Sequence, residues 1–165
     1  MNQINLLRLE NKYKPETLAI LGSIFFEKVE IDDLENGTDF AVYRIKPKNR
    51  IANRWRDIQY HPRYGNQFTI RWELPSGGRT ERHKIQDFLV DYLLYGFVDE
   101  FGPGIVKWKL IDLEPIATNY IVPSELHQNN TPDKTTLAAF DLDSYPKDKI
   151  IKVWQRPGYK LWHQV

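Results

Sequence analysis

Hydrophobic and polar residues alternate most regularly over residues 68–74. The even-numbered positions hold Phe, Ile, Trp and Leu, and the odd-numbered positions hold Thr, Arg and Glu. A period of two with aromatic and β-branched side chains predicts a half-buried strand. We therefore expect the even-numbered side chains to face the core, and Thr69 and Arg71 to be more exposed.

A turn and a helix are expected directly after this strand. Pro75 removes a backbone donor, and the glycine pair at 77–78 permits positive φ angles, so the strand should end here. Thr80 is followed by Glu81, which suits the start of a helix. We expect a short helix over residues 80–89.

The remaining pattern predicts more strands than helices. A helix should begin at Pro15, and the region around 51–60 should contain a one-turn helix or a strand. The other expected elements are strands at 38–45, 91–99, 104–113, 135–142 and 150–155, and a short helix at 124–128. This order predicts an α+β fold around a mixed β-sheet, with a helix before and between the strands.

The chain length of 165 residues fits a single domain spanning residues 1–165. We expect its core at about 15–113 and a C-terminal β extension at about 114–165. The chain has no cysteine, which excludes disulfides and thiolate metal sites. No stretch approaches 18 apolar residues, so we expect no membrane span and a soluble cytoplasmic protein.

Charge is distributed unevenly along the chain, although the formal net charge is only +1. Residues 44–84 hold 11 Lys or Arg against 3 Asp or Glu, and both flanking segments are net acidic. This basic block is typical of a polyanion-binding surface. The alternative is a solvated surface whose cations pair with the acidic segments.

Arginines and aromatic residues are interleaved within the basic block. Arg54, Arg56 and Arg63 are candidates to contact nucleic-acid phosphates, and Tyr64 is a candidate to stack on a base. The alternative for the aromatic residues of this stretch is that they pack into the core.

Two carboxylates on expected strands are candidate metal ligands. Asp39 begins the 38–45 strand, and Glu73 lies near the end of the 68–74 strand. Mg²⁺ prefers oxygen ligands and usually takes one or two protein carboxylates. Arg71 or Lys84 is the candidate cation that would stabilise charge on a phosphate beside that metal.

This arrangement resembles the core of the PD-(D/E)XK nuclease superfamily. The resemblance rests on a helix, the Gly-Thr-Asp segment ending at Asp39, the strand that carries Arg71 and Glu73, and the helix and strand that follow. It covers about residues 15–100. It implies a restriction-endonuclease-like core and a Mg²⁺-dependent nuclease that cleaves or binds DNA, with Asp39 and Glu73 as the metal-binding acids.

The sequence departs from the superfamily pattern at one catalytic position. The lysine expected two residues after Glu73 is replaced by Pro75. The resemblance therefore implies that Lys84 or Arg71 supplies the catalytic cation, and that Glu27 stands in for the helix acid.

Two other classes of function compete with the nuclease hypothesis. One is a non-catalytic α+β binding module whose basic face meets a protein or a nucleic acid. The other is a β-rich pocket for a small ligand, lined by the many aromatic side chains.

Overall fold

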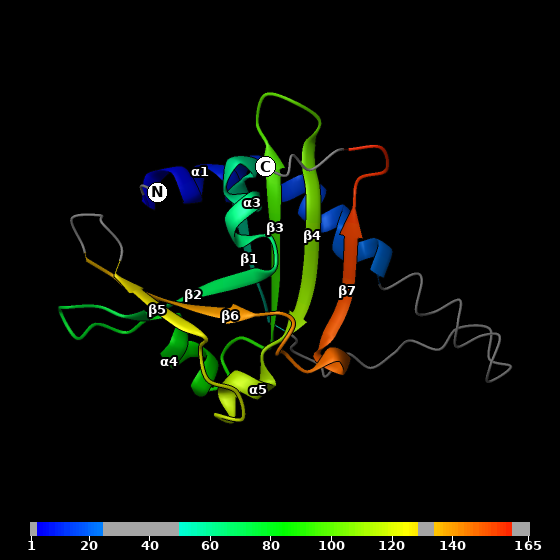
Figure 1. Cartoon of the computed structure of the whole chain (residues 1–165). Helices are drawn as coiled ribbons and strands as arrows, with labels where there is room; N and C mark the ends of the chain where they lie inside the picture. The colour runs from blue at the N-terminus through cyan, green and yellow to red at the C-terminus, as the bar shows by residue number, and fades with distance from the viewer. Residues whose placement is uncertain (1–2, 25–49, 129–133, 160–165) are drawn as a thin grey trace, which may run out of the picture.

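The computed structural model describes residues 3–24, 50–128 and 134–159 (Figure 1). Residues 14–24 form a helix that follows α1. The labelled elements are α1 (Gln3–Lys12), β1 (Ile51–Asp57), η1 (Ile58–Tyr60), α3 (His61–Tyr64), β2 (Gln67–Glu73), α4 (Glu81–Gln86), β3 (Tyr92–Asp99), β4 (Gly104–Asp112), α5 (Glu114–Ala117), β5 (Glu125–Gln128), β6 (Thr136–Asp141), η2 (Lys147–Lys149) and β7 (Ile150–Gln155).

The strands form two separate sheets. The larger sheet has the order β1-β3-β4-β7, with β1 parallel to β3 and the other pairs antiparallel. The smaller sheet has the order β2-β6-β5 and is entirely antiparallel. The chain therefore has an α+β fold with a mixed sheet, and the stretch after residue 114 contributes strands to both sheets.

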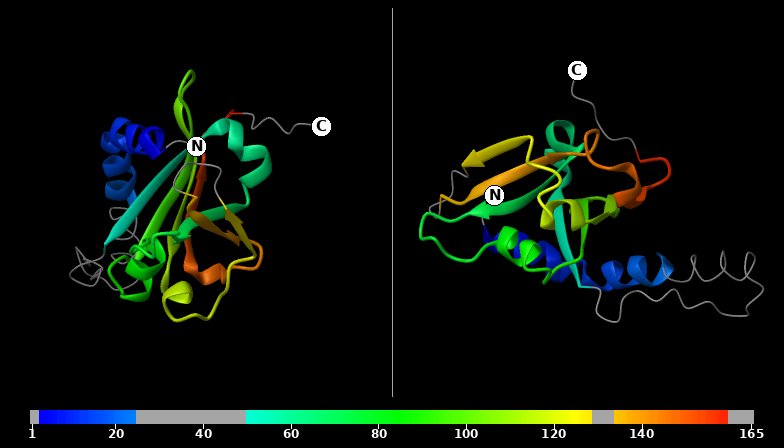
Figure 2. Two further views of the ribbon diagram at one scale, coloured as in Figure 1. Left: turned by 90° about the vertical axis from the view of Figure 1, so that its left-hand side faces the viewer. Right: turned by 90° about the horizontal axis from the view of Figure 1, so that it is seen from below.

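The elements stack in three layers (Figure 2). The helices of residues 3–24 cover one face of the larger sheet, and the smaller sheet crosses its other face. The helix-side core contains Leu9, Tyr13, Ile24, Trp55, Leu94, Val98, Ile105, Trp108 and Leu110. The inter-sheet core contains Phe68, Ile70, Ile85, Leu93, Tyr95, Phe97, Val106, Ile111, Leu113, Ile116, Ala138, Phe140, Leu142 and Tyr145.

Because successive side chains of β1 point to opposite faces of the sheet, they enter both cores. Trp55 is fully buried on the helix side, where its indole Nε1–H donates to Thr17 Oγ1 at 3.1 Å. Because successive strand residues face opposite ways, Arg54 and Arg56 point toward the smaller sheet, and both donate to Thr69 of β2. The space between the sheets therefore contains charged side chains as well as apolar ones.

The expected strand at 68–74 is present as β2, with one difference in burial. Phe68 and Ile70 are buried and Trp72 is partly buried against the same core, as the alternation predicts. The expectation for Thr69 was wrong, since its exposed fraction is only 4%. Arg54 donates to the Thr69 carbonyl and Arg56 to the Thr69 hydroxyl, so the polar face of the strand is enclosed at this residue.

Several further predictions can be compared with the structure. The hairpin of strands 91–99 and 104–113 is confirmed as β3 and β4, and α4 begins directly after Thr80. The predicted helix at 124–128 is wrong, because β5 forms there and pairs with β6. The strand predicted at 38–45 lies outside the described residues.

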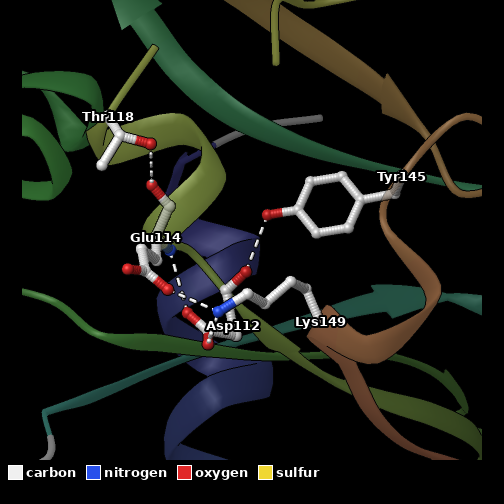
Figure 3. Close-up of polar contacts among 5 residues, drawn as sticks. All are labelled: Asp112, Glu114, Thr118, Tyr145 and Lys149. Carbon is white, nitrogen blue, oxygen red and sulfur yellow. Dashed lines mark hydrogen bonds and ion pairs between the residues drawn. The ribbon is translucent and has the colours of Figure 1, made fainter. Parts of the chain in front are cut away.

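A polar cluster joins α5 to the segment between β6 and β7 (Figure 3). The Tyr145 hydroxyl donates to the Asp112 carbonyl at 2.7 Å, and the Lys149 ammonium bridges the carboxylates of Asp112 and Glu114. The Thr118 hydroxyl donates to the Glu114 carbonyl at 2.9 Å. These contacts hold the end of β4 against the start of β7. We therefore interpret the polar side chains of this cluster as structural groups.

Within residues 3–24, 50–128 and 134–159, no helix is long and apolar enough to cross a lipid bilayer.

Candidate functional site

A cleft of about 270 Å³ lies among α1, β1 and α4. Its lining residues are Glu10, Ala52, Asn53, Arg54, Ile70, Glu81, Lys84, Ile85, Val90, Leu93 and Leu113. We call it the Glu10 cleft. The floor is apolar because it is the end of the inter-sheet core, and charged groups from three elements surround it.

Arg54 and Glu81 form the buried wall of the cleft. The exposed fraction of Arg54 is 6%, and its guanidinium donates to the Thr69 carbonyl at 2.8 Å and to Glu81 Oε1. The second carboxylate oxygen of Glu81 accepts the backbone N–H of Arg71 at 2.8 Å. Both side chains are thus held in place by hydrogen bonds to β2.

Glu10 extends from α1 into the cleft and has no hydrogen-bonded partner among the described residues. Burial raises the pKa of its carboxyl above the ordinary value, and the neighbouring Glu81 carboxylate adds to the rise. The positive charges of Arg54 and Arg71 oppose it. The result is a half-buried carboxyl group that would gain from a positively charged or hydrogen-bonding ligand.

Lys84 lies on the exposed side of the cleft, in the last turn of α4. That helix is fixed to β2 because the Thr80 hydroxyl donates to the Trp72 carbonyl at 3.0 Å, and the Thr80 N–H donates to His83 Nδ1 at 3.1 Å. No hydrogen bond or ion pair joins the Lys84 ammonium to any described side chain. A cation is therefore available at the mouth of the cleft.

Of the catalytic residues expected from the sequence, some lie in or beside the cleft and another lies away from it. Lys84 lines it, and Arg71 lies close enough to affect the charge on Glu10. Glu73 is exposed at the end of β2, opposite Thr136, and does not line the cleft. Asp39 and Glu27 lie outside the described residues, so the predicted Asp39–Glu73 metal pair stays a prediction.

Sequence reasoning missed Glu10 and Glu81 as candidate site residues. In the described part of the chain, no group of three or more acidic or histidine side chains is placed to hold a metal ion. Glu10 and Glu81 are the two carboxylates of the cleft, and two are enough for Mg²⁺, which completes its shell with water or substrate oxygens. The E-x-x-K spacing of Glu81 and Lys84 puts both on one helix face, and this was the available signal.

The four residues expected to bind nucleic acid have different environments. Arg54 is buried and paired, so its guanidinium is not offered to solvent. Arg56 is half-buried between the rings of Tyr64 and Tyr95, at 6.0 Å and 5.8 Å from their centroids. Arg63 is exposed and lies 5.2 Å from the centre of the Tyr64 ring, so these two form the solvent-facing part of the set.

Comparisons with protein-family models, with curated proteins and with solved structures found no match for this chain.

Proposed function

We propose that this chain is a nuclease-like domain that binds nucleic acid and hydrolyses a phosphodiester at the Glu10 cleft. The observation that carries the proposal is that one cleft is lined by two carboxylates, Glu10 and Glu81, and by the Lys84 ammonium, which has no partner among the described side chains. Phosphoryl transfer needs positive charge placed at the phosphate oxygens, and little covalent chemistry from the protein. The resemblance to a restriction-endonuclease-like core belongs to this proposal.

The proposal places a Mg²⁺ ion at the carboxylates of the cleft. Glu10 is half-buried and has no hydrogen-bonded partner among the described residues, and burial is the main cause of its raised pKa. Glu10 and Glu81 would hold the ion, and Asp39 and Glu73 remain candidates from the sequence. When bound, Mg²⁺ would polarise a phosphate oxygen and lower the pKa of a coordinated water.

The other residues have roles that follow from their positions. Lys84 would contact a non-bridging oxygen of the phosphate at the mouth of the cleft. Arg54 would hold Glu81 in place from below, because its guanidinium is already bonded to that carboxylate and to β2. Arg63 and Tyr64 would contact the nucleic acid outside the cleft by phosphate pairing and base stacking.

The experiment is cleavage of supercoiled plasmid and of single-stranded DNA with Mg²⁺ or with EDTA. Lys84→Met and Glu10→Gln should each slow Mg²⁺-dependent cleavage by about 100-fold, the usual effect of removing one charge-stabilising group. The matched control is Lys14→Met, an exposed lysine on the neighbouring helix outside the cleft. It should cleave at the native rate.

The outcomes separate this proposal from the two competing functions. Cleavage that is lost in both cleft variants and kept in the control supports the nuclease. Binding of DNA without any Mg²⁺-dependent cleavage would favour the non-catalytic binding module. Neither binding nor cleavage would overturn the proposal and favour a protein or small-molecule ligand.

A further inference from the structure

A second cluster of charge lies between the two sheets, and it shares only Arg54 with the lining of the Glu10 cleft. Two rows of paired residues cross the larger sheet on its inter-sheet face. Arg54, Tyr95 and Lys109 are register partners on β1, β3 and β4, and Arg56, Phe97 and Lys107 are partners in the next row. Each row therefore places an aromatic ring between two cations.

Among the described residues, Arg54 alone of these four cations has a carboxylate partner. Arg54 is paired with Glu81, as described above. Arg56 donates to the Thr69 hydroxyl at 2.6 Å, and Lys109 donates to the Gly65 carbonyl at 2.7 Å. The Lys107 ammonium lies 3.1 Å from His61 Nε2. Arg56, Lys107 and Lys109 thus share one region, where their hydrogen-bond partners are a hydroxyl, an imidazole nitrogen and a backbone carbonyl.

Burial makes this concentration of positive charge costly. The exposed fraction of Lys109 is 5%, and burial together with the charge of Lys107 lowers the pKa of Lys109 to about 8. Asp141 and Asp143 lie near enough to favour its charged form, but neither is hydrogen-bonded to it. Buried charges without a paired counter-charge are rare outside functional sites.

Two buried donors in the same region make no hydrogen bond within the described residues. The Arg56 Nε atom is fully buried and makes no hydrogen bond within the described residues. The hydroxyl of Tyr95, whose exposed fraction is 1%, lies near Thr69 and Arg56 but makes no hydrogen bond of ordinary geometry. Buried donors of this kind are normally satisfied, so an acceptor with several oxygens would complete their hydrogen bonding.

We propose that Arg56, Lys107 and Lys109 form a binding site for a phosphate group between the two sheets. A phosphate dianion carries enough charge and enough acceptor oxygens for one guanidinium and two ammonium groups. The depth of the site favours a free or terminal phosphate, since a continuous diester backbone would need two exits from a buried position. This site is independent of the proposed nuclease function, because none of its three cations lines the Glu10 cleft.

The test measures binding of inorganic phosphate by calorimetry and by thermal unfolding, against sodium chloride at equal ionic strength and pH 7. Phosphate should raise the unfolding temperature of the native chain in a saturable way, and chloride should not. Lys109→Met and Arg56→Met should each weaken phosphate binding at least tenfold. Lys14→Met, which alters an exposed lysine on the helix-side layer, should bind like the native chain.

Each variant also reports on folding. Without phosphate, Lys109→Met should unfold at a higher temperature than the native chain, because an uncompensated buried charge is gone. Lys107→Met, at a half-buried position, provides a second binding test if Lys109→Met does not fold. Equal effects of phosphate and chloride, or native phosphate affinity in the variants that fold, would overturn the proposal.

Two further ligands distinguish the source of the phosphate group. A 5′-phosphorylated oligonucleotide should bind more tightly than inorganic phosphate if the natural ligand is a nucleic-acid end, and its 5′-hydroxyl counterpart should not displace phosphate. If only inorganic phosphate binds, the site takes the free anion. Both results support a phosphate site.

Discussion

Arg54 and Glu81 together occupy the free edge of β2. Arg54 donates to the Thr69 carbonyl, and Glu81 accepts the N–H of Arg71, while the two side chains are paired with each other. A carbonyl and the N–H two residues later are the groups that a neighbouring strand would bond. The ion pair therefore replaces a strand partner and protects the edge from pairing with another chain.

Replacing one partner of this ion pair should destabilise the fold more than replacing both partners. Glu81→Leu leaves Arg54 buried without its counter-charge and should lower the free energy of unfolding by about 3–5 kcal/mol. The double variant Arg54→Met with Glu81→Leu should recover part of that loss, because no charge is then left unpaired. Denaturant unfolding of the native chain, both single variants and the double variant measures the coupling. Additive effects would show that the pair contributes little.

Gly96 should not tolerate a side chain. A Cβ at this position would lie 2.4 Å from Trp55 Cζ3 and 2.5 Å from the Lys107 carbonyl oxygen, and that carbonyl belongs to the backbone. Gly96→Ala should therefore destabilise the fold by about 1–3 kcal/mol or more. Gly22→Ala is the matched control, because nothing lies within 4 Å of its added Cβ and helical alanine is favoured by about 0.5–1 kcal/mol. Thermal unfolding that ranks these two variants in the opposite order would contradict the packing at Trp55.

Glu10 should make stability depend on pH below neutrality. Because its pKa is raised in the folded chain, the folded state binds more protons than the unfolded state just above the ordinary Glu pKa. Its contribution to stability is full below the unfolded pKa and is lost as the pH rises through the folded pKa. Glu10→Gln should thus be more stable than the native chain at pH 7, with the advantage disappearing near pH 4. Urea unfolding at several pH values checks the difference.

Lys109 should have the opposite dependence at alkaline pH. Its pKa falls from 10.5 to about 8 on folding, mainly through burial, and Lys107, Asp141 and Asp143 are the charged groups that modify it. The unfolded state therefore binds more protons between these values, so stability should rise as the pH increases from about 8 to 10.5. Lys109→Met removes this part of the pH dependence. A native chain whose pH profile matches that of the variant would show that Lys109 is solvated.

Arg63 should contribute to nucleic-acid binding, whereas the paired Arg79 should not. If DNA binds through the exposed pair of Arg63 and Tyr64, Arg63→Ala should reduce the slope of log K against log salt by about 0.9. Arg79→Ala removes an exposed arginine that is paired with Asp87, and it should leave the slope unchanged. Fluorescence titration of a short duplex at several salt concentrations measures both. Equal slopes for the native chain and Arg63→Ala would exclude a phosphate contact at Arg63.

The sequence by itself determined the local elements whose signals are local. The period of two along 68–74, the Gly- and Pro-rich turn between β3 and β4, and Thr80 before α4 each act within a few residues, so the strands, the hairpin and the helix start were predictable. The prediction of a helix at 124–128 was wrong for the complementary reason. Its conformation depends on pairing with β6, and a neighbouring strand overrides weak helical preference.

Only the tertiary structure decided which charged residues meet. Arg54 reads in the sequence as one of several surface arginines, but it is buried because Glu81, 27 residues away, and the edge of β2 receive its donors. Glu10 carries no motif, and it enters a cleft only because α1 packs beside β1. Solvation of a charge depends on what lies around it in three dimensions, and the alternation of a strand records only which face a residue takes, not what covers that face.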